Sequence, residues 1–584
     1  MKPEIQKFFR GDVEDDAETL LKYSHDASLL EVRPKIVLFP KDSEDVKNLV
    51  KWVNENKQKY PDLSITARCA GTDMSGGAIG ESIILDFTRY MNKLIGGPLP
   101  MKTKSIWEIA VQPGMFYRDF EKITLEKGMI LPCYTASKSI NAMGGMFGNN
   151  SAGERTLKYG QTENYILEAK VVFADGNEYV VKPLNKQELN KKITQNDFEG
   201  NVYKNIFSLI QNNESEIQHA KPKVSKNSAG YYIWNVEGQK PKTLSGAEGY
   251  AFDLNKLLVG SQGTLGIVTE ITFKVIPENK YSKLVAIFVN DIGPLGRLVE
   301  EILTLNPETL ETYDDKTMKL AVKFFPDFLK NKGILGMLKF MWSFLPEALL
   351  MLKDGFPKLI ILAEFAGNDE KEVDKKCQVL KSRLKIFNPD IKSGSQPNAS
   401  GLKVHITKSE IEANKYWDIR RESFALLRKH VKGMRTAPFI DDVIVRPEFL
   451  PKFLPELNAI LSGYDLMFTL AGHAGDGNFH IIPLMDFKRP GTAKIIMELS
   501  DKVYDLVGRY HGSITAEHND GIIRTPYLDK MYPKEIIRLF AEIKKIFDPL
   551  NILNPGKKVP TEEEGTKKYI TDHIAIEHDA KHKV

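Results

Sequence analysis

Hydrophobic and polar positions in the first half of the chain switch between the spacing of strands and the spacing of helices. Residues 36–40 are a short apolar run closed by a proline, which predicts a buried strand. Asp42 or Ser43 is placed to cap the helix that follows, because apolar residues recur at helical spacing from Val46 to Val53. The first half is therefore expected to be mixed α/β. Further strands are predicted at 63–67, 82–87, 106–111, 167–173 and 267–275.

From Leu284 onward the texture of the sequence changes. The apolar runs at 286–289 and 359–365 predict strands, and each is followed by a helix rich in lysine and glutamate. This change predicts a second region with its own organisation. More strands are predicted at 442–445, 466–471 and 479–484, and amphipathic helices at 494–510 and 533–547.

The most apolar stretch of the chain, residues 333–352, lies within a long aromatic segment that is predicted to be helical. Lys339, Pro346 and Glu347 interrupt it, so it falls short of a membrane-spanning helix. Two interpretations remain open for it: a buried or capping helix pair, or a surface that touches a membrane.

Composition narrows the classes of function. The 584 residues include 81 Lys and Arg against 77 Asp and Glu, a net charge of +4 that gives no case for nucleic acid binding. The three cysteines, Cys69, Cys133 and Cys377, form no CxxC pair. A disulfide framework, a cysteine-type zinc site and an iron–sulfur cluster are therefore not expected, and a reducing compartment fits best.

The two ends of the chain carry no recognisable signal for export or metal binding. Residues 1–16 are polar and lack the apolar core of a signal peptide, so a cytoplasmic location is expected. From about Val559 the chain is charged and contains His573, His578 and His582. We expect this end to be a loosely held tail rather than a metal site.

Three glycine-rich segments occur in the first half. RCAGTDMSGG at 68–77 lies between two predicted strands and matches neither a Rossmann nor a Walker pattern. MGGMFGNNSAG at 143–153 is too rich in glycine for a strand or helix interior, so an irregular backbone surface is expected. GSQGTLGI at 260–267 leads into a strand. Because glycine lets backbone N–H groups approach a ligand closely, the three segments together predict a large bound ligand.

The sharpest signal is LAGHAGDGNFHII at 470–482, with a turn signature between two apolar runs. It predicts a hairpin with His473 and His480 on its two stems. Downstream, Glu517 and His518 in the segment AEHNDG offer a carboxylate and a third imidazole. Two histidines and a carboxylate suit zinc, manganese or ferrous iron. Histidines that are only hydrogen-bonded in the core remain the alternative.

These segments also resemble a known family. The runs RCAGTDMSGG, NAMGGMFGNNSAG and GSQGTLGIVTEI are similar to the FAD domain of the vanillyl-alcohol oxidase and p-cresol methylhydroxylase superfamily, especially its D-lactate, glycolate and D-2-hydroxyglutarate dehydrogenase branch. The hairpin and AEHNDG resemble the C-terminal domain of that branch, and the resemblance covers roughly residues 30–558.

The resemblance implies an α+β fold, in which a two-subdomain FAD-binding domain of this type is joined to an α+β substrate (cap) domain with an antiparallel sheet. The implied domains are an N-terminal segment 1–30, the FAD-binding domain 31–277, the substrate domain 278–530, a helical segment 531–558 that returns to the FAD domain, and a charged tail 559–584.

The resemblance also implies the roles of individual residues. Thr72 stands where some relatives attach FAD through a histidine, so the FAD is expected to be non-covalent. His473, His480 and Glu517 are implied to bind a divalent metal (zinc, or else manganese or iron), and His518 to act as the base. The implied FAD contacts are Arg68, Gly71, Thr72, Asp73, Gly76, Ser137, Gly144, Gly145, Gly148, Asn149, Gly153, Gly260, Gly263, Thr264, Gly266, Ile267 and Asn554.

Arg420 lies in the segment YWDIRRE, a context in which relatives place the arginine that binds the substrate carboxylate. A guanidinium can bind a carboxylate through two hydrogen bonds, which suits this role. The alternative is a solvated arginine that pairs with Asp418 or Glu422.

The implied activity is the oxidation of a 2-hydroxy carboxylate to the 2-oxo acid, with hydride transfer to flavin N5. The chain has no iron–sulfur ligands, so an external electron acceptor is expected: a quinone, a cytochrome or an electron-transfer flavoprotein. The alternatives are a non-redox flavoenzyme resembling alkylglycerone-phosphate synthase, and a partner-dependent electron-transfer subunit. Peripheral contact with the inner face of a membrane and a homodimer both stay open.

Overall fold

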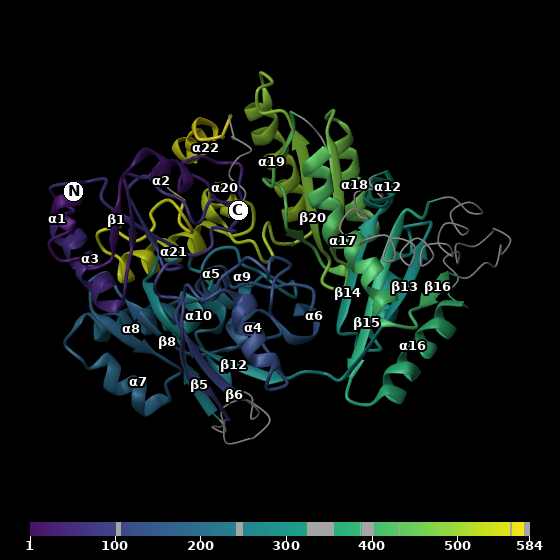
Figure 1. Ribbon diagram of the computed structural model, residues 1–584, viewed down its shortest axis with the longest axis horizontal. Coiled ribbons are helices and arrows are strands. Elements are labelled where there is room, and N and C mark those ends of the chain that lie inside the picture. Colours follow the sequence, from purple (N-terminus) through teal and green to yellow (C-terminus); the bar gives the residue numbers. More distant parts are fainter. Residues whose placement is uncertain are drawn as a thin grey trace. The chain divides into compact units, whose positions relative to one another are not determined.

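The structure is a computed structural model (Figure 1), and it describes residues 1–100, 107–240, 249–323, 356–385, 387, 402–430, 433–560 and 563–576. Contacts divide the chain into two units, each assembled from separate stretches of sequence. The first unit comprises Met1–Gly153, Gly160–Glu278 and Ser513–Val584, and the second comprises Glu154–Tyr159 and Asn279–Gly512. The sequence placed the end of the substrate domain at 530, whereas this division ends the second unit at Gly512.

A small sheet organises the N-terminal part of the first unit. Its strands follow the order β1-β2-β4-β3, in which β2, β4 and β3 run parallel and β1 is antiparallel to β2. The strands span Asp12–Glu14 (β1), Ile36–Phe39 (β2), Ile65–Arg68 (β3) and Ile83–Asp86 (β4).

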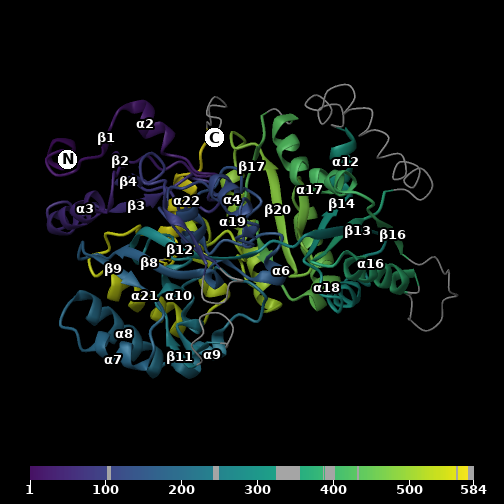
Figure 2. The same ribbon diagram turned by 60° about the horizontal axis from the view of Figure 1, so that its bottom comes forward.

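Helix α3 (Ser43–Asn56) covers this sheet, and Figure 2 shows it beside β2, β3 and β4. The Asp42 carboxylate accepts hydrogen bonds from the backbone N–H groups of Glu44 and Asp45, so the helix begins at the predicted cap. The side chains at helical spacing are buried against the strands: Val46, Leu49, Val50 and Val53.

A larger antiparallel sheet follows in the first unit, in the order β5-β6-β12-β8-β9, with β7 also paired to β12. Strand β12 is central because β6 pairs with it on one side and β8 on the other. A separate pair joins β10 (Glu237–Lys240) to β11 (Gly249–Phe252). The sheet's strands are Leu94–Pro100 (β5), Trp107–Val111 (β6), Met129–Ile130 (β7), Ile166–Val172 (β8), Glu178–Val181 (β9) and Ile267–Pro277 (β12).

The helices of the first unit include short segments beside the glycine-rich loops and longer amphipathic ones. They span Lys2–Ile5 (α1), Ala17–Lys22 (α2), Tyr117–Leu125 (α4), Met143–Asn149 (α5), Lys186–Ile193 (α7), Phe198–Asn212 (α8), Glu214–Ala220 (α9), Asn255–Leu258 (α10), Gly521–Arg524 (α20), Lys534–Phe547 (α21) and Glu563–Asp572 (α22).

One antiparallel sheet forms the centre of the second unit. Its strands follow the order β16-β13-β15-β14-β19-β20-β17, and β18 also pairs with β20. They span Tyr281–Val289 (β13), Thr309–Asp314 (β14), Leu359–Gly367 (β15), Lys403–Ile406 (β16), Arg435–Thr436 (β17), Val443–Ile444 (β18), Met467–His473 (β19) and Asn478–Met485 (β20).

Side chains of α17 pack on one face of this sheet, where Tyr416, Trp417 and Ile419 meet Tyr313 and Leu362. Helix α16 contacts β13, β15 and β16 (Figure 1). The helices of this unit span Thr156–Tyr159 (α6), Leu295–Leu303 (α11), Asp315–Lys323 (α12), Glu370–Lys385 (α16), Glu410–His430 (α17), Leu450–Ser462 (α18) and Thr492–Arg509 (α19).

The hydrophobic periodicity predicted these elements well, with end residues shifted by a few positions. The strands predicted at 36–40, 267–275 and 479–484 are β2, β12 and β20, and the helix predicted at 533–547 is α21. The apolar stretch 333–352 lies outside the described residues, as do Ile106, His578 and His582. Among the residues that the structure describes, no helix is both long and apolar enough to cross a membrane.

The expectation of a loosely held C-terminal tail is wrong for residues 563–576. Helix α22 forms there, and Ile570 and Ala575 are each only 2% exposed. The backbone of Glu31 donates a hydrogen bond to the carbonyl of His573, and Leu30 forms a bridge with Ile574. The sequence prediction missed this because the segment is rich in charged residues and contains only a few apolar ones, such as Ile570 and Ala575, that become buried.

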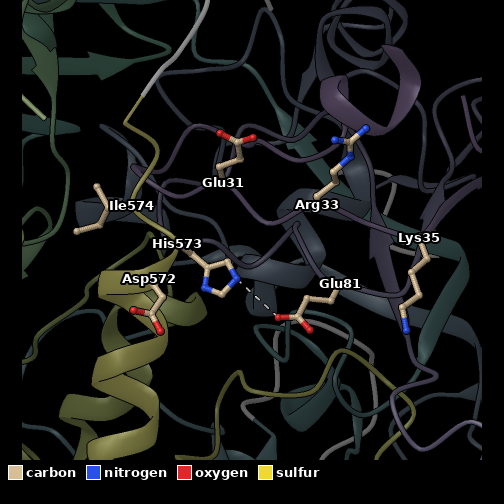
Figure 3. A pocket seen from close by; sticks show the side chains of 7 residues that line it. All are labelled: Glu31, Arg33, Lys35, Glu81, Asp572, His573 and Ile574. Carbon is tan, nitrogen blue, oxygen red and sulfur yellow. Dashed lines mark ion pairs between the residues drawn. The ribbon is translucent and has the colours of Figure 1, made fainter. Parts of the chain in front are cut away.

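The C-terminal segment also forms one wall of a surface pocket of about 470 Å³ (Figure 3). His573 points at Glu81 there, with 3.7 Å between Nε2 and Oε1. The other lining residues are Glu31, Arg33, Lys35, Asp572 and Ile574.

Substituting two isoleucines tests whether this end of the chain is held. Ile570→Ala removes a buried side chain and is expected to destabilise α22 by about 2–5 kcal/mol. Ile576, which is 60% exposed, provides the matched control, and Ile576→Ala should change stability by less than about 0.5 kcal/mol. Trypsin cleavage after Lys567 and Lys568, followed by mass spectrometry, measures the opening of the helix. Rapid cleavage there in the unsubstituted protein would contradict a held segment.

Candidate functional site

The first glycine-rich segment connects β3 to β4 and is held in shape by the carboxylate of Asp73. Its Oδ2 accepts hydrogen bonds from the backbone N–H groups of Ser75, at 3.0 Å, and Gly77, at 2.6 Å. Its Oδ1 accepts one from the Asn149 side chain at 2.8 Å. Gly71 and Gly76 have φ of 67° and 86°, a region that favours glycine. Asp73 therefore organises the segment and links it to the second one.

The second segment differs from the prediction, because residues 143–149 form helix α5 rather than an irregular surface. The low helix propensity of glycine is overridden by packing, since Met143, Met146 and Phe147 are buried at helical spacing. Gly144 is needed for this contact: a Cβ there would lie 2.6 Å from the Cβ of Pro113. A Cβ on the exposed Gly145 would have no atom within 4 Å.

The third segment, between α10 and β12, centres on Gln262, a residue that sequence reasoning did not select. Gln262 is 6% exposed and has a φ of 53°. Its side-chain Oε1 accepts a hydrogen bond from the backbone N–H of Gly521. The backbone N–H of Gln262 donates to the carbonyl of Gly148. Gly260 and Gly263 also have positive φ, of 82° and 72°.

Several of the implied FAD contacts have evident structural roles. A Cβ on Gly153 would lie 2.1 Å from the carbonyl oxygen of Tyr134, and one on Gly266 would lie 2.5 Å from Val171. Thr264 is buried and its hydroxyl is hydrogen-bonded to Tyr231. Packing alone therefore accounts for these residues. Arg68 donates to the carbonyl of Ala78, Ser137 is hydrogen-bonded to Thr135, and Ile267 is 1% exposed.

The closing segment of the chain ties these loops together through Asn554. Its side-chain amide donates to the carbonyl of Gly77 at 2.9 Å and to that of Gln262 at 2.7 Å. Its Oδ1 accepts a hydrogen bond from the Thr66 hydroxyl. Asn554 is fully buried, so it holds the first and third segments in a fixed relation.

The segment AEHNDG belongs to the first unit and lies directly on the glycine-rich loops. Ser75 donates a hydrogen bond to the backbone carbonyl of His518 at 3.3 Å. The Asn519 amide donates to the carbonyl of Gly260 at 2.8 Å, and Asn519 itself has a φ of 69°. This turn lets adjacent side chains approach one region, since His518 Nε2 lies 3.9 Å from Glu517 Oε1.

A buried lysine accompanies Glu517. Lys226 Nζ donates to Glu517 Oε2 at 2.8 Å, and the two side chains are 0% and 7% exposed. Hydrophobic periodicity did not point to Lys226, because it lies in an irregular stretch between α9 and the 3-10 helix Ile233–Asn235. The pairing neutralises a buried charge and fixes one oxygen of the carboxylate.

The predicted histidine hairpin forms in the second unit from β19 and β20. His473 and His480 lie on its two stems, with ring centroids 5.3 Å apart. His473 Nδ1 lies 2.6 Å from Glu311 Oε1, and His480 Nδ1 lies 3.1 Å from Asp441 Oδ1. A carboxylate at Nδ1 orients Nε2 for a ligand, which is the usual arrangement of metal-binding histidines.

Two acidic residues before β18 complete this side of the hairpin. Asp441 and Asp442 are both fully buried, and Asp442 has a φ of 71°. Within this unit, a carboxylate oxygen of Asp442 and a ring nitrogen of His480 lie within 4.8 Å of one another. Imidazole nitrogens and carboxylates are the donors that zinc, manganese and iron accept, so the residues fit a divalent metal. Asp441 and Asp442 could have been selected from the sequence, because two adjacent acidic residues there precede a short apolar run.

Arg420 is not a solvated arginine, which was the alternative interpretation. Its side chain is 7% exposed and forms an ion pair with Glu311, the same carboxylate that contacts His473. Glu311, on β14, was missed by sequence reasoning because the alternation of this strand shows nothing unusual at that position.

The glycine-rich segments fit a flat ligand at Gly145 and Gly148, where a Cβ would meet at most one atom within 4 Å. Gly144→Ala and Gly145→Ala form a matched pair, because both substitutions raise the helix propensity of α5 equally. Gly144→Ala should lower the melting temperature of the apoprotein, since its Cβ collides with Pro113. Gly145→Ala should leave it unchanged or raised, and weaken binding of FAD followed by flavin fluorescence. An equal fall in melting temperature for both would contradict the packing difference.

Comparison with known proteins identifies the family. Residues 34–182 match the family described as FAD binding domain, and residues 278–558 match FAD linked oxidases, C-terminal domain. The chain is 26% identical to D-2-hydroxyglutarate dehydrogenase of Pseudomonas putida, over 94% of this chain and 50% of that protein. It is 24% identical to glycolate oxidase subunit GlcD of Bacillus subtilis, over 92% of each chain. The chain thus spans about half the length of the D-2-hydroxyglutarate dehydrogenase.

Solved structures show the same fold. An alkyldihydroxyacetonephosphate synthase aligns with a TM-score of 0.63 at 15% identity, covering 95% of this chain and 85% of that one. A p-cresol methylhydroxylase with substrate bound aligns with a TM-score of 0.62 at 14% identity, covering 94% of each chain. The predicted α+β fold with an FAD-binding domain of the p-cresol methylhydroxylase type is therefore confirmed. The chain belongs to the FAD-linked oxidases, with the FAD binding domain and the C-terminal domain of that family.

Proposed function

We propose that the protein oxidises a 2-hydroxy carboxylate of the D-lactate, glycolate or D-2-hydroxyglutarate type to the 2-oxo acid. The observation that carries the proposal is the hairpin, in which buried carboxylates hold both His473 and His480 at Nδ1. Such orientation suits binding of a divalent metal, and Arg420 lies on the same carboxylate as His473. A metal and a guanidinium together recognise a hydroxyl next to a carboxylate.

The proposed metal ligands are the residues that the sequence suggested. We propose that His473, His480 and Glu517 bind the divalent metal, as the resemblance of their motifs to the family implies, with zinc as the first choice. Asp442 is a further candidate from the second unit.

The division of labour follows from the chemistry of each side chain. Arg420 binds the substrate carboxylate, and His518 takes the proton of the hydroxyl group, since neutral imidazole is a competent base near pH 7. FAD, bound without a covalent bond because Thr72 replaces the attaching histidine, would accept the C2 hydride, while the metal would polarise the hydroxyl. Electrons then pass to an external acceptor: a quinone, a cytochrome or an electron-transfer flavoprotein.

Residues on the glycine-rich segments are proposed to contact FAD. Gly145 and Gly148 have the strongest support, because packing does not require glycine at either position. Gly144, Gly153 and Gly266 are needed by their own packing, so their contribution to FAD binding is the local backbone shape.

Anaerobic bleaching of the flavin tests the proposed reaction. The protein, loaded with FAD and zinc, is mixed with glycolate, the two lactates and the two 2-hydroxyglutarates, and absorbance near the flavin band is followed. One of these acids should bleach the flavin in a single turnover. Absence of bleaching by every acid, in protein that retains FAD and metal, would contradict the proposal and favour a non-redox flavoenzyme.

Two adjacent substitutions separate the base from the metal ligand. His518→Ala should retain the metal and slow flavin reduction by roughly 10²–10⁴-fold, the usual effect of losing a general base. Glu517→Ala should lower metal content, with partial recovery of the rate when zinc is added. The exposed His219 supplies the control, because His219→Ala lies on the surface helix α9. Loss of metal in His518→Ala would make His518 a ligand instead.

A further inference from the structure

A single buried carboxylate joins two residues of the proposed site. Glu311 lies on β14 and its side chain is 1% exposed. Its Oε1 is 2.6 Å from His473 Nδ1, and its Oε2 forms an ion pair with Arg420 Nη2. His473 was selected from the hairpin motif and Arg420 from a separate segment in α17. In the structure both side chains contact Glu311.

The backbone fixes this arrangement. Strand β14 pairs with β19 through Thr312 and Gly472 and through Tyr313 and Ala471, so the antiparallel register places Glu311 opposite His473. Arg420 reaches the same point from α17, whose Tyr416, Trp417 and Ile419 are packed on the sheet. All of these residues belong to the second unit.

The electrostatics favour a single geometry. A carboxylate that is this deeply buried is stable only when it is paired and hydrogen-bonded, and Arg420 supplies the opposite charge. The remaining oxygen accepts from Nδ1–H of His473, which fixes the tautomer in which Nε2 carries the lone pair. Removing the charge of Glu311 therefore affects the imidazole and the guanidinium together.

We propose that Glu311 is a shared positioning residue, which orients His473 toward the metal and Arg420 toward the substrate carboxylate. This inference rests on the proposed function, because it assigns Glu311 to the same metal and the same 2-hydroxy acid. Glu311 touches neither of them and acts only through its two partners. Metal affinity and substrate recognition are consequently linked through one side chain.

Glu311→Gln tests the proposal, because it retains the size of the side chain and removes its charge. The zinc affinity, measured by competition with a chromophoric chelator, should fall about 10–100-fold, the usual effect of losing a carboxylate behind a metal-bound histidine. The KM for the 2-hydroxy acid should rise as well, and FAD content should stay unchanged. Unchanged zinc affinity together with unchanged KM would overturn the proposal.

Glu308 provides the matched control in the same unit. It is also 1% exposed, lies directly before β14 and forms ion pairs with Arg155 and Lys158. Glu308→Gln removes a buried, arginine-paired carboxylate of the same kind, so any general destabilisation is matched. Zinc affinity should be unchanged in Glu308→Gln. An equal fall in both variants would show that loss of a buried charge, rather than orientation of His473, lowers the affinity, and would overturn the proposal.

A double substitution separates the effect of Glu311 on substrate binding, which passes through Arg420, from its effect on zinc affinity, which passes through His473. In the background of Arg420→Met, Glu311→Gln should no longer raise the KM, whereas it should still lower the zinc affinity, because only the first effect passes through Arg420. Failure of the proposed function looks different: the unsubstituted protein would bind no zinc, or His473→Ala would keep its full affinity. Additive KM effects in the double variant would overturn the shared role.

Discussion

Segments rich in glycine cannot maintain their own shape, and the first unit depends on buried side-chain amides that hold them. Asn554 donates to the carbonyls of Gly77 and Gln262, and Asn519 donates to that of Gly260. The first segment is held at Gly77 and the third at Gly260 and Gln262, in each case from a part of the chain more than 250 residues away in sequence.

Buried charges around the proposed site occur in pairs that join different elements. Lys226 pairs with Glu517, Lys558 with Asp520, and Arg420 with Glu311. Burial lowers the pKa of Lys558 and favours its neutral form, and the carboxylate of Asp520 acts in the opposite direction. Such pairs contribute little net stability compared with apolar packing, but breaking one of them is costly. They therefore specify orientation rather than stability.

Local patterns in the sequence predicted most of the fold, because strands such as β2 and helices such as α21 carry their periodicity within a few residues. The hairpin was predictable for the same reason, since its turn and its two histidines lie within one short motif. Glu311 was not, because its role depends on the register between β14 and β19, and local sequence does not encode that register. Helix α5 was missed because tertiary packing of Met143 and Phe147 overrides the propensity of the glycines.

The discontinuity of the first unit has a consequence for the synthesis of the protein. Residues 279–512 are synthesised before Asn519 and Asn554, so the chain of the second unit is complete while the first unit still lacks its last segment. Until translation passes residue 554, the glycine-rich loops lack the amides that hold them. A nascent chain that stalls after residue 512 therefore lacks the side chains that hold the first and third glycine-rich segments.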